Sequence, residues 1–199
     1  MSEGLRSQKK QETRKTISDV ATRLFVERGF EEVTIAEVAA AARVAKMTVT
    51  NHFPRKEDLV FDIRAEFTAW PATLIKDRPF DEVRDAYFAA VAQQHAYVGF
   101  SGPPFVRMIQ ESAALSAALH DMHRAREEAM REVLVARNPD GGILPRAAAA
   151  HLTAVLRLLF DEAFELSRAD VPRDDLAAAL ITSATAAFDQ LEPALRQCP

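Results

Sequence analysis

Four side chains that can touch the edges of DNA bases share one face of a short predicted helix. Residues 46–53 read KMTVTNHF, and at helical spacing Val49 and Phe53 fall on a common apolar stripe. The opposite face carries Met47, Thr48, Thr50 and Asn51. An Asn amide can bond N6 and N7 of adenine, and a Met thioether can lie against the thymine methyl. Thr hydroxyls can reach a phosphate or a base, so this row predicts nucleic-acid recognition.

Positive charge and helix starts surround the row. Lys46 opens the same helix, and Lys56 opens the next predicted helix, where backbone N–H groups also favour a phosphate. Thr34 starts the preceding helix and can contact a phosphate in the same way. His52 has two open roles, because its ring can contact a phosphate or fill the seam between helices.

The recognition row needs a helix packed behind it, and residues 34–42 predict that helix. Thr34 followed by Glu37 is a capping-box signature. An apolar face follows at helical spacing, made of Ile35, Val38 and Ala39. The run of alanines at 39–42 is small enough for a second helix to cross closely. Two short helices around a tight break are the layout of a helix-turn-helix.

The stretch from Thr34 to Val60, TIAEVAAAARVAKMTVTNHFPRKEDLV, resembles the DNA-binding signature of the TetR family of bacterial transcriptional regulators. The resemblance extends back to about Thr13. Several features recur together in register: Thr34, Ala39, Val44, Lys46, Thr48, Val49, Phe53 and the exit Lys56-Glu57-Asp58-Leu59. The DNA-binding set predicted from the row and the resemblance is Thr34, Arg43, Lys46, Met47, Thr48, Thr50, Asn51, His52 and Lys56.

Three positions depart from the commonest family pattern. Arg43 occupies the turn position usually held by Gly, so the turn either avoids a positive φ or tolerates its strain. Ala45 replaces the usual Ser or Thr cap. Thr50 stands where an aromatic residue is common, so a Tyr–phosphate contact cannot be carried over.

Charge is divided unevenly along the chain. The 199 residues carry a net charge of −4, which on its own argues against nucleic acid. Residues 1–56 hold 11 Lys or Arg and 7 Asp or Glu, a net of +4, whereas residues 57–199 hold 14 and 22, a net of −8. A basic N-terminal segment followed by an acidic remainder is typical of a protein that contacts nucleic-acid phosphates with its N-terminal part only.

Composition excludes several other classes. The single cysteine, Cys198, allows no internal disulfide and no cysteine-based metal cluster, and it suggests a reducing cytoplasm. The polar N-terminus does not resemble a signal peptide, and no apolar run reaches the roughly 20 residues of a membrane span, so we expect no membrane partner. His120 and His123 form an i, i+3 pair without a third ligand nearby, and no nucleotide or hydrolase motif occurs. We expect no metal, no cofactor and no enzyme.

The pattern predicts helices throughout the rest of the chain, interrupted by Gly and Pro. The expected helices span residues 8–28, 56–70, 80–98, a segment from 103, 117–137, 146–168 and 174–195, with a loop at 138–142. The predicted fold class is all-α, with an N-terminal three-helix DNA-binding domain at 1–54. A C-terminal helical bundle for ligand binding and dimerisation follows at 55–199, with residues 56–70 as the linking helix.

Aromatic residues interleaved with polar ones mark the second domain. Such stripes are usually plain core, but the resemblance implies an effector pocket inside this bundle. The predicted pocket residues are Phe67, Trp70, Tyr87, Phe88, His95, Phe105, Met108, Phe160 and Phe164.

The last two helices have wide apolar faces, with Leu158, Leu166, Ile181 and Leu195 outside the main stripe. More apolar surface than one core needs suggests a partner, and the resemblance implies a homodimer through these helices. The predicted dimer residues are Leu152, Leu156, Leu159, Leu180, Ala184 and Phe188. A self-contained bundle edge is the alternative.

The resemblance implies a homodimeric, ligand-responsive regulator that binds a palindromic operator in double-stranded DNA. It would act as a repressor that a small-molecule effector releases. A helical enzyme or small-molecule carrier that retains a non-functional helix-turn-helix is the alternative. Salt-dependent, sequence-specific retention of DNA separates the two.

Overall fold

Every regular element in the described part of the chain is a helix. The computed structural model describes residues 2–195, with side chains from Gln8 onward; Cys198 lies outside these residues. The all-α prediction is confirmed. None of these helices combines the length and the apolar character needed to span a membrane.

The chain divides into two compact units, which are described separately. The first, called the head, comprises the residues up to Arg64 together with Met108–Ala118. The second, called the body, comprises Ala65–Arg107 and the residues from Leu119 onward. The boundary crosses three helices, α4 (Arg64–Ala69), α6 (Pro103–Glu111) and α7 (Ala113–Arg137).

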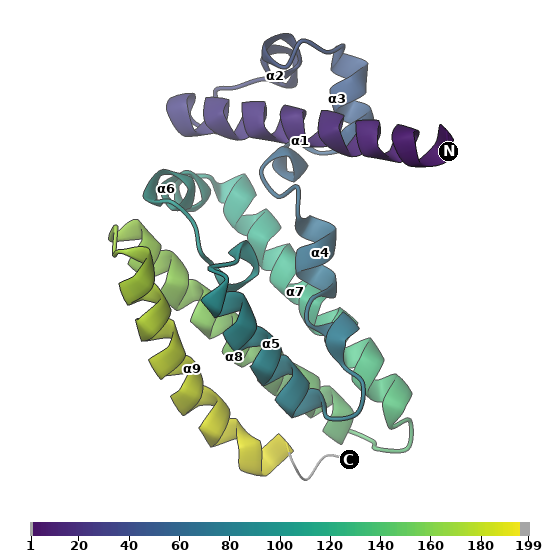
Figure 1. The fold of residues 1–199 in the computed structure, drawn as a ribbon, viewed down its shortest axis with the longest axis vertical. Helices are drawn as coiled ribbons and strands as arrows, with labels where there is room; N and C mark the ends of the chain where they lie inside the picture. The colour runs from purple at the N-terminus through teal and green to yellow at the C-terminus, as the bar shows by residue number, and fades with distance from the viewer. Residues whose placement is uncertain (1, 196–199) are drawn as a thin grey trace. The chain divides into compact units, whose positions relative to one another are not determined.

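The head is built on a long first helix that packs against a short second helix, which in turn packs against a short third helix (Figure 1). Its N-terminal elements are α1 (Ser2–Arg28), α2 (Ile35–Ala41), α3 (Lys46–His52) and the 3₁₀ turn η1 (Lys56–Leu59). The apolar stripe of α1 meets the inner faces of α2 and α3 in a core whose buried members include Ile17, Ala21, Phe25, Val38, Val49 and Phe53. The predicted apolar stripe on 46–53 is therefore confirmed.

The single linking helix predicted at 56–70 is wrong. The chain forms η1, then irregular backbone, then the short helix α4 (Arg64–Ala69). The consecutive residues Leu59, Val60 and Phe61 are all buried, and three neighbours cannot share one helical stripe. The Leu59 and Asp62 carbonyls accept hydrogen bonds from α1 side chains instead of from a following helical turn. Tertiary contacts with α1 replace the helix.

The body contains a core of long helices. Helix α8 (Leu144–Arg168) runs beside α9 (Arg173–Leu195), which in turn contacts α5 (Pro79–Ala92) (Figure 1). Two 3₁₀ turns, η2 (Ala72–Leu74) and η3 (Ala96–Val98), flank α5. The predicted helix at 80–98 ends early because Gln94 adopts a left-handed φ of 51°. The predicted loop at 138–142 is confirmed, since α7 ends at Arg137 and α8 begins at Leu144.

Candidate nucleic-acid interface

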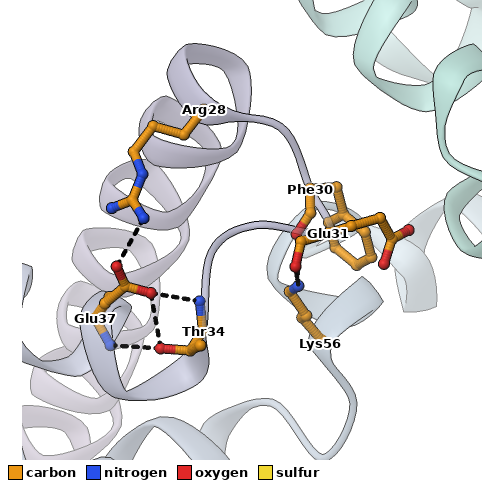
Figure 2. Close-up of polar contacts among 6 residues, drawn as sticks. All are labelled: Arg28, Phe30, Glu31, Thr34, Glu37 and Lys56. Atoms are coloured by element: carbon orange, nitrogen blue, oxygen red, sulfur yellow. Dashed lines mark hydrogen bonds and ion pairs between the residues drawn. The ribbon is translucent and has the colours of Figure 1, made fainter.

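The start of α2 is held by the predicted capping box (Figure 2). The Thr34 Oγ1 accepts from the Glu37 backbone N–H at 3.2 Å, and the Thr34 N–H donates to Glu37 Oε2 at 2.8 Å. Arg28 donates to the other carboxylate oxygen at 2.7 Å. The Thr34 backbone, then Arg28 and the Thr34 hydroxyl, lower the pKa of Glu37 to about 2. The Thr34 side chain is exposed, and its hydroxyl is bonded within the cap.

The turn between α2 and α3 carries local strain. Arg43 has a φ of 56°, a left-handed conformation that usually favours Gly. The sequence left two options for this turn, and the structure shows the one that tolerates a positive φ. Ala45 at the start of α3 supplies no side-chain cap. The exposed Arg43 side chain therefore sits on a turn whose backbone would suit Gly better.

The outer face of α3 presents the predicted row of side chains. Met47 is 69% exposed, and Lys46 and Asn51 are also exposed. Thr48 and Thr50 are half-buried, and Thr50 donates its hydroxyl hydrogen to the Met47 carbonyl at 3.1 Å. On the inner face, Val49 and Phe53 are fully buried. The exposed amide of Asn51 and thioether of Met47 are the groups best placed to meet base edges.

Arg14 holds the end of α3 in place, and the sequence reading missed it. Its guanidinium donates to the His52 carbonyl at 2.5 Å and to the Asp62 carbonyl at 3.2 Å. The same group lies over the Phe53 ring, 4.2 Å from the centroid. Arg14 stands one helical turn before Ile17 on the buried stripe of α1, so extending that stripe backwards would have found it.

His52 lies half-buried beside Phe53, with ring centroids 6.4 Å apart. Burial, followed by the positive charges of Lys10 and Arg14, lowers the pKa of its imidazole. The ring therefore lies among cations at one end of α3. Both open roles of His52 therefore stay predictions.

Lys56 does not extend freely from the head. Its ammonium donates to the Phe30 carbonyl at 2.5 Å and lies within 3.4 Å of the Glu31 carbonyl (Figure 2). It also lies 4.4 Å from the centroid of the Phe30 ring and 5.6 Å from that of Phe25. Carbonyls and ring faces of its own domain therefore contact this ammonium, and its role at a DNA phosphate stays a prediction.

The nine predicted pocket residues do not form one cluster. Tyr87 and Phe88 contact Phe188. A second group joins Phe67 and Phe160 to the His123 ring, with Phe164 against Phe160. A third stacks Tyr97 between Trp70 and His95. Phe105 is half-buried on α6, and the buried Met108 belongs to the head.

The body also contains a cavity of about 430 Å³. None of the nine predicted pocket residues lines it. Its walls combine charged and apolar side chains, among them Asp77, Arg78, Asp81, Arg137, Phe80, Leu134, Leu152 and Leu195. The Arg78–Asp81 ion pair, at 3.1 Å, occupies part of this wall.

The six predicted dimer residues require a correction. Leu152, Leu156, Leu159, Leu180, Ala184 and Phe188 are all buried in the core of one chain. Their apolar faces pack α8 against α9 and α5, so their side chains do not form an outer surface. The exposed apolar side chains on these helices include Leu158, at 58%, and Ile181, at 45%. A partner would have to meet these residues instead.

The head has the geometry of a helix-turn-helix DNA-binding domain, with a capped supporting helix and an outward-facing recognition helix. A model of the family described as "Bacterial regulatory proteins, tetR family" matches residues 17–63, which lie in this head. The head of this chain is therefore similar to the DNA-binding domain of the TetR family of bacterial regulatory proteins.

Known proteins resemble the chain locally in sequence and broadly in fold. The HTH-type transcriptional regulator AcrR of Shigella flexneri is 43% identical over 56 residues, which make up 28% of this chain and 26% of that protein. The aligned segment thus spans about a quarter of the length of this curated relative. NalD, the secondary repressor of the MexAB-OprM multidrug efflux pump in Pseudomonas aeruginosa, is 21% identical with a TM-score of 0.54, covering 95% of this chain and 96% of that one. The fatty acid degradation regulator FadR from Bacillus halodurans is 17% identical with a TM-score of 0.52, covering 88% and 94%. These two structures show the fold.

Proposed function

We propose that this protein is a transcriptional regulator that binds double-stranded DNA through α3. The observation that carries the proposal is the outer face of that helix. It exposes Lys46, Met47 and Asn51 while Val49 and Phe53 anchor its inner face. Asn51 would read a base and Lys46 would bind a phosphate. Arg14 would act as a positioning residue, because it holds the carbonyl end of α3.

The regulator would bind a palindromic operator as a homodimer. Two recognition helices reach successive major-groove faces when they lie one helical turn apart, roughly 34–36 Å. The exposed Leu158 on α8 and Ile181 on α9 support pairing through these helices. Exposed small residues such as Ala154 and Ala178 leave room for close approach of a second copy.

A small-molecule effector bound in the body would lower operator affinity, so the protein would act as a repressor in the cytoplasm. NalD shares the fold and is named as a repressor, which supports this direction of regulation. The effector must bind the DNA-incompetent state more tightly. A coupling of about 1–3 kcal/mol would weaken operator binding about 5- to 150-fold.

The DNA-binding proposal is tested with the full-length protein and a random-sequence duplex library. We expect selection sequencing to return a palindrome, and retention of it to fall steeply as salt rises. Recovery of no preferred sequence, with only weak salt-dependent binding, would refute the proposal and favour a carrier or enzyme with a non-functional helix-turn-helix.

The dimer is tested by placing charge on the proposed interface. Leu158→Glu combined with Ile181→Glu should convert a dimer to a monomer in sedimentation and abolish tight palindrome binding. Leu144→Glu is the matched control, because Leu144 is also exposed, at 52%, but lies at the start of α8. A wild-type monomer that still binds the palindrome tightly would exclude this architecture.

A further inference from the structure

The body buries a cation that no acidic residue neutralises. Arg126 on α7 is 2% exposed, and none of the ion pairs among the described residues includes it. Its guanidinium donates to the Phe67 carbonyl at 3.1 Å and to the Tyr97 carbonyl at 3.3 Å. Burial lowers its pKa to about 9, so it stays cationic at neutral pH. A buried charge without a counter-charge is costly, so its presence needs a reason.

A second polar side chain on the same face of α7 is also unsatisfied. His123 stands one helical turn before Arg126, and both of its ring nitrogens are buried without a hydrogen-bond partner among the described residues. Burial, followed by the nearby charge of Arg126, lowers the pKa of His123 to about 3. The ring is therefore neutral at pH 7, with one nitrogen able to donate and the other able to accept.

Aromatic rings surround these two groups. The guanidinium carbon lies 3.5 Å from the centroid of the Phe67 ring and 5.4 Å from that of Trp70. His123 meets Phe67 and Phe160 edge-on, at 5.3 and 5.0 Å between centroids. The site thus combines one cation, one neutral imidazole and several apolar ring faces.

A purely structural role for Arg126 explains only part of this arrangement. Arg14 and Lys56 in the head also bind backbone carbonyls, but both are partly exposed, so water can solvate their remaining donors. Arg126 is almost fully buried, and its bonds to the Phe67 and Tyr97 carbonyls use two of its five N–H donors. The unpartnered nitrogens of His123 have no structural explanation at all.

We propose that Arg126, assisted by His123, binds the acidic group of an organic anion, such as a carboxylate, whose apolar part packs among Phe67, Trp70 and Phe160. A guanidinium binds carboxylates through parallel N–H···O bonds, and the neutral His123 adds a donor. This inference rests on the proposed function, because it assigns the chemical class of the effector. It names a different site from the cavity beside Arg78 and Asp81.

Trp70 is the single tryptophan of the chain, so its fluorescence reports on this site. The full-length protein is titrated with benzoate, phenylacetate and 4-phenylbutyrate, and in parallel with the amide of each. We expect saturable fluorescence changes, with at least one carboxylate binding about tenfold more tightly than its neutral amide. Equal binding of acid and amide, or no saturable binding of any of the three carboxylates, overturns the proposal without recourse to a variant.

Variants then locate the anion. Arg126→Met should abolish the preference for carboxylate over amide, and His123→Leu should weaken carboxylate binding. Arg124→Met is the matched control, because Arg124 lies on the same helix with its side chain 82% exposed, and it should keep wild-type values. Retention of the full preference in a folded Arg126→Met variant overturns the proposal. If Arg126→Met does not fold, the comparison of acid with amide in the wild-type protein decides.

A DNA-retention assay separates this inference from the proposed function. Carboxylates that bind and release the selected palindrome support both. Carboxylates that bind but leave DNA retention unchanged support the anion site and overturn its role as the effector site. A protein that retains the palindrome but binds none of the three carboxylates leaves the regulator intact and overturns the anion site.

Discussion

The head and the body differ in how fully their polar side chains are hydrogen-bonded. In the head, Thr34, Glu37 and Lys56 are each bonded to backbone or side-chain partners nearby. Two Arg64 nitrogens, Nε and Nη2, are buried without a hydrogen bond, but Nε lies 3.3 Å from Asp58 Oδ1 in an ion pair. In the body, the Tyr87 hydroxyl, both His123 nitrogens and the Ser167 hydroxyl are buried without partners among the described residues. The polar side chains around the α2 cap and Lys56 are therefore hydrogen-bonded within the head, whereas the body retains hydrogen-bonding groups that its described residues do not use.

The largest expected effect concerns Asn51, on the outer face of α3. Asn51→Ala should cost about 1–3 kcal/mol of DNA-binding free energy in each half-site and relax the preference at one base position. The melting temperature should stay at the wild-type value, because the Asn51 side chain is exposed. Binding titrations measure the loss of DNA-binding free energy, and selection sequencing measures the relaxed base preference.

Lys46→Ala provides the contrast for Asn51. Its exposed ammonium would bind phosphate, so the variant should weaken all sequences alike and reduce the salt slope. Identical specificity profiles for the two variants would contradict the division into base reader and phosphate anchor.

The next effect belongs to the body. His123 is neutral in the folded state because burial depresses its pKa to about 3 from an ordinary 6.5. In the unfolded chain it takes up a proton as the pH falls below about 6.5, so stability present at neutral pH is lost towards pH 3. Between about pH 7.5 and about pH 5, this residue should lower the free energy of unfolding by about 2 kcal/mol.

Denaturant titrations of wild type and His123→Leu at the two pH values isolate this contribution. The variant should lose less stability than wild type on acidification. His151→Gln is the control, because His151 is exposed on α8, and it should retain the wild-type loss. If wild type and His123→Leu lost the same unfolding free energy on acidification, the pKa of the folded His123 imidazole would not be depressed, and the prediction would be wrong.

Lys56→Met tests whether the head uses its lysine internally. Loss of the bonds to the Phe30 and Glu31 carbonyls and of the ring contacts should destabilise the protein by about 1–2 kcal/mol. Because the ammonium is held within the domain, the salt dependence of DNA binding should keep its wild-type slope. A shallower slope with unchanged stability would support the phosphate role predicted from sequence.

Arg43→Gly should produce the smallest change. Gly adopts a φ of 56° without the steric cost of a side chain, so the variant should gain up to about 1 kcal/mol of stability. If Arg43 contacts a phosphate, DNA affinity should fall while stability rises. A variant that loses stability would show that the Arg side chain supports the turn in another way.

Much of the head could be predicted from the sequence because its signals are local. The capping box depends on two residues three positions apart, and the inner face of α3 follows from helical periodicity. The internal contacts of Lys56 escaped prediction because their partner Phe30 lies far along the chain. Arg14 was missed although the apolar stripe of α1, extended backwards, reaches it. A basic side chain near a DNA-binding motif suggests a phosphate contact until the fold shows which carbonyl it meets.

In the body, the sequence predicted apolar helix faces but not what they pack against. The sequence determined that its last helices carry wide apolar faces, but an apolar face packs equally well against its own chain or a second copy. Only the fold placed Leu156 and Phe188 in the core and left Leu158 and Ile181 exposed.

Arg126 sits in a run of mixed charges, which by composition alone would usually be solvated, yet it stands four residues from both Met122 and Met130 on the buried stripe of α7. The packing of Phe67 and Tyr97 around it buries that charge, because long-range contacts decide which side of a helix meets water. Local spacing therefore determined most of the helices and the outer face of α3, whereas tertiary packing decided the backbone between η1 and α4 and the environment of each charged group.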